Sequence, residues 1–230
     1  RKHDVKVSFH PGQFTVLASD TPDIVDRSID EFEYHVNMAR WMGFGKSFQD
    51  GCKINVHISG RQGPAGIIKA IPRLSPEARN LLTIENDEMG WGLESSLELE
   101  KHCALVLDIH HHWVRTGEYI QADDDRVKRV VDSWRGVRPT MHYSYSRDEW
   151  LTPAYPNAED MHKGFHDMET LLSKGCKKQK LRAHSELLPN RAVNEWALSF
   201  LPNLDIQVEA KMKNQAAEQL HTQAEELGLV

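Results

Sequence analysis

The stretch Ala104-Leu105-Val106-Leu107-Asp108 is an apolar, β-prone run that stops at a carboxylate. Five further runs have the same form and also end in His or Glu: Val5–His10, Lys53–His57, Leu81–Glu85, Arg138–His142 and Leu204–Glu209. In a barrel of parallel strands, the carboxyl ends of all strands open onto one face, which carries the active site. The pattern therefore predicts an α/β barrel with metal-binding side chains at its mouth.

Segments with helical periodicity separate these runs. Asp20-Thr21-Pro22 supplies a capping residue and a Pro in the first turn, and apolar side chains follow at helical spacing. Similar patterns occupy Asp123–Trp134, Asn190–Leu201 and Met212–Leu227. This alternation of strand and helix favours a parallel sheet or barrel over an all-β fold.

The chain length suits one domain. The 230 residues, 40% of them hydrophobic, can form a single core over 1–230. Only six strands can be counted, and the first residue is Arg1 rather than Met. We therefore expect a TIM (β/α)8-type barrel that is truncated at the N-terminus and lacks its first two βα units. Ser144–Lys180 breaks the alternation and is expected to be an insertion on the active face, and Ser59–Pro64 is expected to be a mobile loop.

Bulk composition narrows the class of protein. The sequence contains no apolar stretch of membrane-spanning length and no secretory signal at its start. Its three cysteines form no CxxC pair, which favours a reducing, cytoplasmic location, and we expect a monomer. The net charge of −6 argues against a generally basic nucleic-acid coat. DNA stays possible as a substrate, because bound divalent cations would add positive charge.

Eight side chains at or near the ends of the runs are candidate metal ligands. They are His10, His57, Glu85, Asp108, His111, His142, His184 and Glu209. Five imidazoles and three carboxylates without a thiolate suit Mn, Zn or Fe, and disfavour a zinc finger or an iron–sulfur cluster. Eight ligands are too many for one ion, so we expect two or three divalent ions with bridging carboxylates.

Each candidate also has a simpler interpretation. A single strand-end His is more often structural than a ligand, Glu85 and Glu209 could form salt bridges, and Asp108 could cap a helix. The joint pattern favours metal, because burying several carboxylates costs several kcal/mol each unless cations compensate. Asp108 and His111 also form a D-x-x-H pair in which the strand holds one residue and the following turn brings back the other. His110 and His112, which flank this pair, are expected to support the ligands or to contact substrate.

The segment His10-Pro11-Gly12-Gln13-Phe14 carries a second signal. Pro-Gly after a strand forces a sharp turn that would raise Gln13 and Phe14 from the active face. A polar amide beside an exposed aromatic could wedge into a DNA duplex. The alternative, which these residues support equally, is that Phe14 begins a packed helix.

Several stretches together resemble the UV damage endonuclease family, whose distant fold relative is endonuclease IV. They occur in the family's order over nearly the whole chain apart from the insertion: Ser8–Phe14, Asn55–Ile58, Leu82–Asp87, Leu107–His112, Met141–Ser144, Arg182–Glu186 and Asp205–Lys211. The resemblance implies a TIM barrel that hydrolyses the DNA backbone immediately 5′ to a UV photoproduct. Metal-activated water would leave a 3′-hydroxyl and a 5′-phosphate.

The resemblance also implies roles for individual residues. The eight candidates would hold up to three ions, commonly Mn²⁺, with Zn²⁺ or Mg²⁺ as alternatives. Glu85 and Glu209 would be the catalytic carboxylates. Gln13 and Phe14 would enter double-stranded DNA where the damaged dinucleotide is flipped out. The sequence departs from the family at Thr140, where a Lys usually stands two residues before the strand-end His, so charge and coordination there must differ.

Three hypotheses follow for the function. The first is a metal-dependent endonuclease acting at photolesions. The second is a barrel metalloenzyme with a small substrate, such as a sugar isomerase or epimerase, and the third is a non-catalytic lesion-binding relative, which Thr140 makes conceivable. The Gln13–Phe14 turn favours DNA over a sugar, because a sugar calls for a closed polar pocket.

Overall fold

The computed structural model describes residues 5–230, which form two compact units. The first unit contains the described residues up to Leu107 together with Asp125–Pro139. The second contains Asp108–Asp124 and Thr140–Val230. Each unit is built around its own parallel sheet.

The sheet of the first unit has four parallel strands in the order β1-β2-β3-β4. These strands are β1 (Ser8–Phe9), β2 (Lys53–His57), β3 (Leu82–Glu85) and β4 (Ala104–Val106). Nearly every residue of β2, β3 and β4 is buried, as expected for parallel strands covered on both faces. The register pairs the last residue of β2, His57, with the last residue of β3, Glu85.

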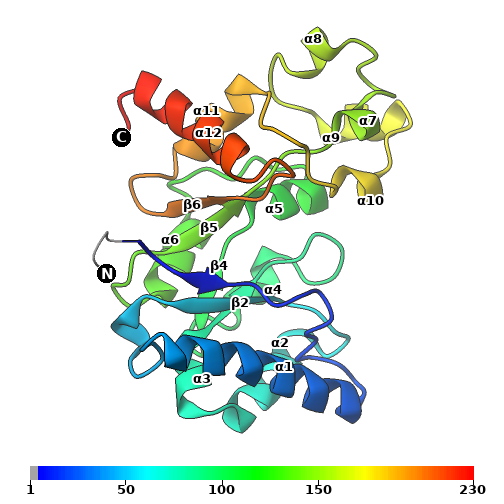
Figure 1. Cartoon of the computed structure of the whole chain (residues 1–230). Coiled ribbons are helices and arrows are strands. Elements are labelled where there is room, and N and C mark those ends of the chain that lie inside the picture. The colour runs from blue at the N-terminus through cyan, green and yellow to red at the C-terminus, as the bar shows by residue number, and fades with distance from the viewer. Residues whose placement is uncertain (1–4) are drawn as a thin grey trace. The chain divides into compact units, whose positions relative to one another are not determined.

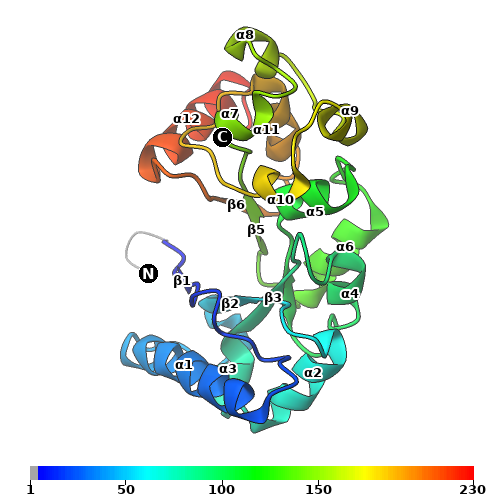
Figure 2. The ribbon, with the colours of Figure 1, turned by 90° about the vertical axis from the view of Figure 1, so that its right-hand side faces the viewer.

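Helices flank this sheet, and Figures 1 and 2 show α1 and α3 along one face of it. They are α1 (Pro22–Trp41), α2 (Gly63–Ala70), α3 (Pro76–Leu81), α4 (Leu93–Leu97) and α6 (Asp125–Ser133), with the short 3₁₀ turns η1 (Phe48–Asp50) and η2 (Ile71–Arg73). The predicted apolar stripe of α1 is buried over Ile29, Phe32, Val36 and Ala39. Beside β4, the buried Trp134 donates its indole N–H to the carbonyl of Leu105 at 2.6 Å.

The second unit contains the parallel pair β5 (Thr140–Tyr143) and β6 (Asp205–Val208). Its helices are α5 (Ile109–Thr116), α7 (Asp148–Leu151), α8 (Ala158–Met161), α9 (Met168–Ser173), α10 (Lys178–Leu181), α11 (Arg191–Leu198) and α12 (Asn214–Glu226). Asn190 caps α11 by accepting the N–H of Val193 at 3.2 Å. In both ribbon views α11 and α12 lie side by side (Figures 1 and 2).

The structure confirms the α/β class with parallel sheets. All six predicted strands form, and the four long periodic segments are the helices α1, α6, α11 and α12. The segment Ser144–Lys180 contains the short helices α7, α8 and α9 and most of α10, with loops between them. The expected loop Ser59–Pro64 is shorter than predicted, because α2 already begins at Gly63.

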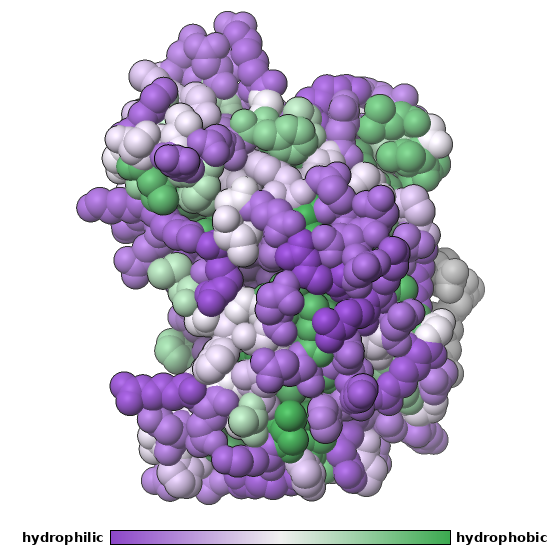
Figure 3. Space-filling view, turned by 180° about the vertical axis from the view of Figure 1, so that it is seen from behind, coloured by the Kyte–Doolittle hydropathy of each residue, from purple (hydrophilic) through white to green (hydrophobic). Residues whose placement is uncertain are grey.

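Hydrophilic residues cover most of the surface seen in Figure 3, and hydrophobic residues appear there in small separate groups. Scattered apolar side chains of this kind are normal on a protein surface. Among the described residues, no helix has the length and apolar character that a membrane crossing requires.

Candidate metal centre and DNA-contacting turn

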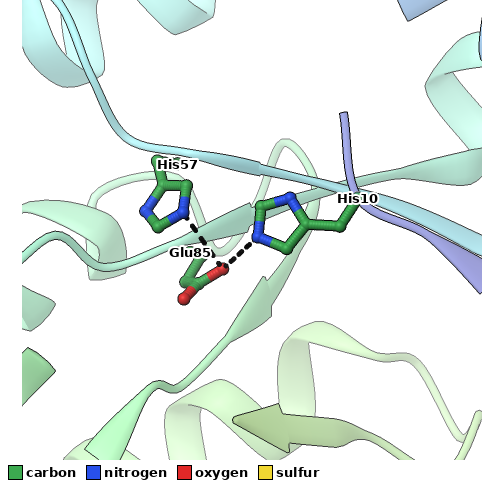
Figure 4. Close-up of side chains that lie close together, drawn as sticks. All are labelled: His10, His57 and Glu85. Carbon is green, nitrogen blue, oxygen red and sulfur yellow. Dashed lines mark ion pairs between the residues drawn. The ribbon is translucent and has the colours of Figure 1, made fainter. Parts of the chain in front are cut away.

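Two histidines and a glutamate of the first unit converge where the parallel strands β1, β2 and β3 end. His10 follows β1, whereas His57 and Glu85 are the last residues of β2 and β3. Figure 4 shows both imidazoles turned toward one oxygen of Glu85. His10 Nε2 lies 3.2 Å and His57 Nε2 lies 3.9 Å from Glu85 Oε2. One ligand atom from each residue lies within 4.8 Å of the others, which is a spacing that one cation can bridge.

The group of His10, His57 and Glu85 places a carboxylate where water cannot solvate it. The Glu85 side chain is fully buried, whereas those of His10 and His57 are each 25% exposed. A buried carboxylate needs compensation by hydrogen bonds or positive charge. The two imidazoles stand 5.1 Å apart between ring centroids and present nitrogen atoms to the same carboxylate, so the donor set fits a divalent cation.

A buried amide orients Glu85. Asn55, two residues before His57 on β2, donates its Nδ2 hydrogen to Glu85 Oε2. Asn55 is itself fixed by Thr83, whose hydroxyl donates to Asn55 Oδ1 at 3.1 Å. Sequence reasoning did not assign Asn55 a role. The available signal was its position two residues before His57, which places both side chains on the same side of the strand.

Five further candidates lie together in the second unit. Asp108 begins this group as the N-cap of α5, where its Oδ1 accepts the backbone N–H of His111 at 2.7 Å. The other carboxylate oxygen, Oδ2, is 3.6 Å from His111 Nδ1. Asp108 therefore caps a helix and also faces the predicted ligand His111. The two interpretations of Asp108 derived from the sequence are compatible.

Glu209 connects the remaining two histidines. Its Oε1 lies 3.2 Å from His142 Nδ1 on β5, and its Oε2 lies 3.8 Å from His184 Nε2. A β-bridge pairs His142 with Asp108, and the rings of His184 and His111 are 6.5 Å apart between centroids. The side chains of Asp108 and His142 are almost completely buried, whereas that of His184 is 28% exposed. The group thus combines imidazole nitrogens and carboxylate oxygens in the proportions that hard and borderline metals prefer.

His110 and His112, which flank His111, interact with other protein side chains. His110 contacts two serine hydroxyls, and its burial next to His184 and His111 holds its pKa well below the usual value. His112 Nε2 lies 2.9 Å from a carboxylate oxygen of Glu118. Both therefore fit the predicted supporting role better than direct ligation.

Cysteine chemistry plays no part in either group. Burial raises the pKa of the Cys52 thiol to about 11 and that of Cys103 to about 12. Both thiols are therefore protonated at neutral pH, which makes them poor nucleophiles, and no cysteine belongs to the groups of possible metal ligands among the described residues. This agrees with a donor set made only of imidazoles and carboxylates.

The segment after His10 forms a tight turn, as its Pro-Gly sequence predicts. The N–H of Thr15 donates to the carbonyl of Gly12 at 3.0 Å, with Gln13 and Phe14 at the tip. Phe14 is 84% exposed, whereas Thr15 is buried. The alternative of a packed helix beginning at Phe14 is wrong, because the next helix, α1, begins only at Pro22. A cavity of about 580 Å³ lies beside the turn and is lined by Phe14, Ile24, Arg27 and Glu31 among others.

Thr140 is the first residue of β5 and is half-buried. It pairs with Asp205 of β6 and precedes His142 by two residues, so both side chains lie on the same side of the strand. The hydroxyl of Thr140 therefore lies on the same face of β5 as the proposed ligand His142. The resembled family usually has the amine of a Lys at this position.

Comparison with known proteins gives a consistent result. The family model described as UV-endonuclease UvdE matches residues 1–229. The UV DNA damage endonuclease of Bacillus pumilus is 30% identical over 172 residues, covering 70% of this chain and 52% of that protein. The UV-damage endonuclease of Schizosaccharomyces pombe is 26% identical over 231 residues, covering 95% of this chain and 34% of that protein.

A solved structure shows the same fold. The crystal structure of SacUVDE superimposes with a TM-score of 0.72 at 23% identity, over 100% of this chain and 68% of that chain. The chain spans about half the length, or less, of the two curated relatives. Because the family model covers nearly every residue, the chain belongs to the UV-endonuclease UvdE family.

Proposed function

We propose that this chain carries the catalytic part of a metal-dependent DNA repair endonuclease, which incises the phosphodiester backbone 5′ to UV photoproducts. The convergence of His10 and His57 on one oxygen of the fully buried Glu85 carries the proposal. Membership of the UvdE family and the names of the curated relatives support it. A sugar isomerase is less well supported, because the exposed turn of Phe14 has no use in a closed polar pocket.

The protein's contribution is to arrange ligands. We assign His10, His57 and Glu85 of the first unit, and Asp108, His111, His142, His184 and Glu209 of the second, to two or three divalent ions, with Mn²⁺ as the first choice. When bound, such ions lower the pKa of water and neutralise charge on phosphate oxygens. Glu85 and Glu209 are the proposed catalytic carboxylates, because each lies within 4 Å of two imidazoles that would hold a metal ion together with it.

The turn at Gln13 and Phe14 is the proposed lesion-recognition element. An aromatic ring that is 84% exposed has most of its surface uncovered and is available to stack on bases. A crosslinked, poorly stacked dinucleotide costs less to extrude than a normal one, so a wedge at this turn would select damaged duplex. Thr15, buried directly behind Phe14, anchors the tip.

Thr140 supports one alternative within the same family. A hydroxyl in place of the amine changes the charge on the His142 face of β5, which could leave lesion binding intact while removing incision. This alternative predicts a protein that binds irradiated DNA without cutting it.

A nicking assay separates these possibilities. Supercoiled plasmid, with and without UV irradiation, is incubated with the protein and Mn²⁺, and nicked circles are counted on a gel. We expect nicks only in irradiated plasmid, and none after chelation of the metal. Binding of irradiated DNA without nicks would favour the non-catalytic alternative. A protein that neither binds nor nicks would refute the proposal.

The finer structural and cellular assignments are part of the same proposal. A TIM (β/α)8-type barrel rests on the alternation of parallel strands and helices in the described residues. The insertion at 144–180, the monomeric state and the cytoplasmic location stay predictions from the sequence.

A further inference from the structure

His110 is a buried polar residue that the proposed ligand set does not use. It lies on α5 directly before His111, is only 4% exposed, and stacks on Trp113 at 5.7 Å between ring centroids. Its Nδ1 is 2.8 Å from the hydroxyl oxygen of Ser144, and its Nε2 is 3.1 Å from that of Ser146. Both ring nitrogens are thus occupied by serines, so His110 is not itself a metal ligand.

The hydrogen-bond pattern fixes the tautomer of His110. The Ser146 hydroxyl donates its single hydrogen to the carbonyl of Leu181 at 2.6 Å, so toward His110 its oxygen can only accept. His110 must therefore carry its proton on Nε2 and donate it to Ser146. The unprotonated Nδ1 then accepts the hydroxyl hydrogen of Ser144.

The two serines belong to a segment that continues from β5 and pairs with the residues around His184. Ser146 forms an antiparallel bridge with His184. The N–H of Ser185 donates to the carbonyl of Tyr145 at 2.7 Å, and the N–H of Arg147 donates to the carbonyl of Ala183 at 3.0 Å. Backbone hydrogen bonds thus hold the segment around His184 against Ser144–Ser146. The side chain of His110 connects both segments to α5 through its bonds to Ser144 and Ser146.

We propose that His110 is a positioning residue that holds the ligand-bearing first turn of α5 against the ligand-bearing segment of His184. His111 follows His110 directly, and His142 precedes Ser144 by two residues. One imidazole therefore connects the segments that carry three proposed ligands, and its ring lies 6.2 Å from that of His184 between centroids. The inference rests on the proposed metal centre. Supporting hydrogen bonds of this kind typically change metal affinity by about 10- to 100-fold.

The tautomer can be tested without metal. In the ¹⁵N-labelled, metal-free protein, long-range ¹⁵N–¹H spectra distinguish a protonated from an unprotonated imidazole nitrogen. We expect Nε2–H and a bare Nδ1 for His110, assigned by loss of the signal in His110→Gln. An Nδ1–H tautomer would overturn the arrangement.

Matched variants test the positioning role. His110→Leu removes both hydrogen bonds, whereas His110→Gln keeps one donor and one acceptor. His166→Leu is the control, because His166 is equally buried at 3%, also contacts Trp113, and bonds to Tyr145 rather than to the serines. Mn²⁺ affinity, the visible spectrum of the Co²⁺-loaded protein and the melting temperature are measured for each.

The expected pattern separates positioning from stability. His110→Leu should weaken Mn²⁺ binding by about 10- to 100-fold and alter the Co²⁺ bands. His166→Leu should lower the melting temperature similarly without either change, and His110→Gln should recover most of the affinity. Equal metal affinity in the two Leu variants, or no rescue by Gln, would refute the role of His110 and leave the proposed function standing. A wild-type protein that binds no divalent metal would refute both.

If His110→Leu does not fold, Ser144→Ala gives a milder test, because it deletes only the hydroxyl that donates to Nδ1. A several-fold loss of Mn²⁺ affinity in a protein with a normal circular dichroism spectrum is expected. Unchanged affinity and unchanged Co²⁺ bands would contradict the proposal.

Discussion

At the scale of single residues, the first unit depends on how one carboxylate is surrounded. Glu85 is fully buried, faces His10 and His57, and accepts a hydrogen bond from Asn55. The amide fixes the direction of the carboxylate, and one ligand atom from each of the two imidazoles and the carboxylate lies within 4.8 Å of the others. The position of the Glu85 side chain therefore depends on Asn55, whereas its proposed binding of a cation depends on its negative charge. A substitution that removes only the charge can test the second role without disturbing the first.

Glu85→Gln is that substitution. Its amide oxygen can still accept from Asn55, so the fold should persist, with a melting temperature of the metal-free protein within a few degrees of wild type. Loss of the charge should lower the bound metal per chain and reduce nicking at least about 100-fold, because a metal ion contributes several kcal/mol to the transition state. Elemental analysis and the plasmid assay measure the two effects.

The matched control is Glu100→Gln, which makes the same charge change in the same unit. Glu100 pairs with Arg129 at 2.7 Å and is no candidate ligand. It should keep full metal content and activity. Full nicking by Glu85→Gln would show that Glu85 has no metal role.

Phe14→Ala tests the exposed turn. The ring is 84% exposed, so its removal should change the free energy of unfolding by no more than about 0.5 kcal/mol. Affinity for irradiated duplex should fall by about 5- to 150-fold, corresponding to the roughly 1–3 kcal/mol of one base–aromatic stack. Fluorescence anisotropy with irradiated and unirradiated oligonucleotides measures this.

Trp41→Ala provides the comparison, because Trp41 is an 85% exposed aromatic on α1 of the same unit. It should bind irradiated DNA as wild type does. If Phe14→Ala and Trp41→Ala bind equally well, the turn is not a wedge.

At the scale of elements, α5 positions a proposed ligand because both of its ends are fixed. Asp108 caps its first turn through the N–H of His111. Gly117 ends it in the left-handed region at φ 79°, where a Cβ would come within 2.9 Å of the Cβ of Met168. The helix therefore cannot shift along its axis without losing a cap, and His111 stays in its first turn.

Two substitutions of Asp108 separate capping from ligation. Asp108→Asn keeps a good N-cap and loses the charge, whereas Asp108→Ala loses both. In the metal-free protein, Asn should cost little stability and Ala about 1 kcal/mol by urea unfolding. Both should lower metal content measured by elemental analysis. Full metal content in Asp108→Asn would assign this residue to capping alone.

At the scale of the whole molecule, the strands and long helices were predictable because their signals are local. The runs ending at His57 and Glu85 carry their own apolar pattern, and α1 carries an apolar stripe at helical spacing. The role of Asn55 was not predictable, because it depends on the register that places Thr83 beside it. The D-x-x-H spacing already set His111 apart from His110, but the serine partners of His110 were not predictable, because they come from the tertiary structure.

The folding stability of the second unit should also depend on pH, through the buried His166. Burial lowers the pKa of His166 to about 4, from 6.5, with His162 adding to the effect. Its Nε2 lies 2.6 Å from the hydroxyl of Tyr145, whose hydrogen the neutral ring can accept. Between pH 6.5 and 4 the unfolded chain binds a proton that the folded chain does not, so stability falls as the pH falls through this window. The group contributes at most a few kcal/mol above pH 6.5.

His166→Gln should flatten this dependence, because its amide oxygen can accept from Tyr145 but cannot titrate. Urea unfolding of the metal-free protein at pH 7, 6, 5 and 4 measures the effect, and the difference between wild type and variant should change steadily across these points. His221→Gln serves as the control, since it makes the same substitution at a side chain that is 62% exposed. Parallel stability curves for wild type and His166→Gln would mean that the ring of His166 charges equally well in both states, against the burial that the structure gives it.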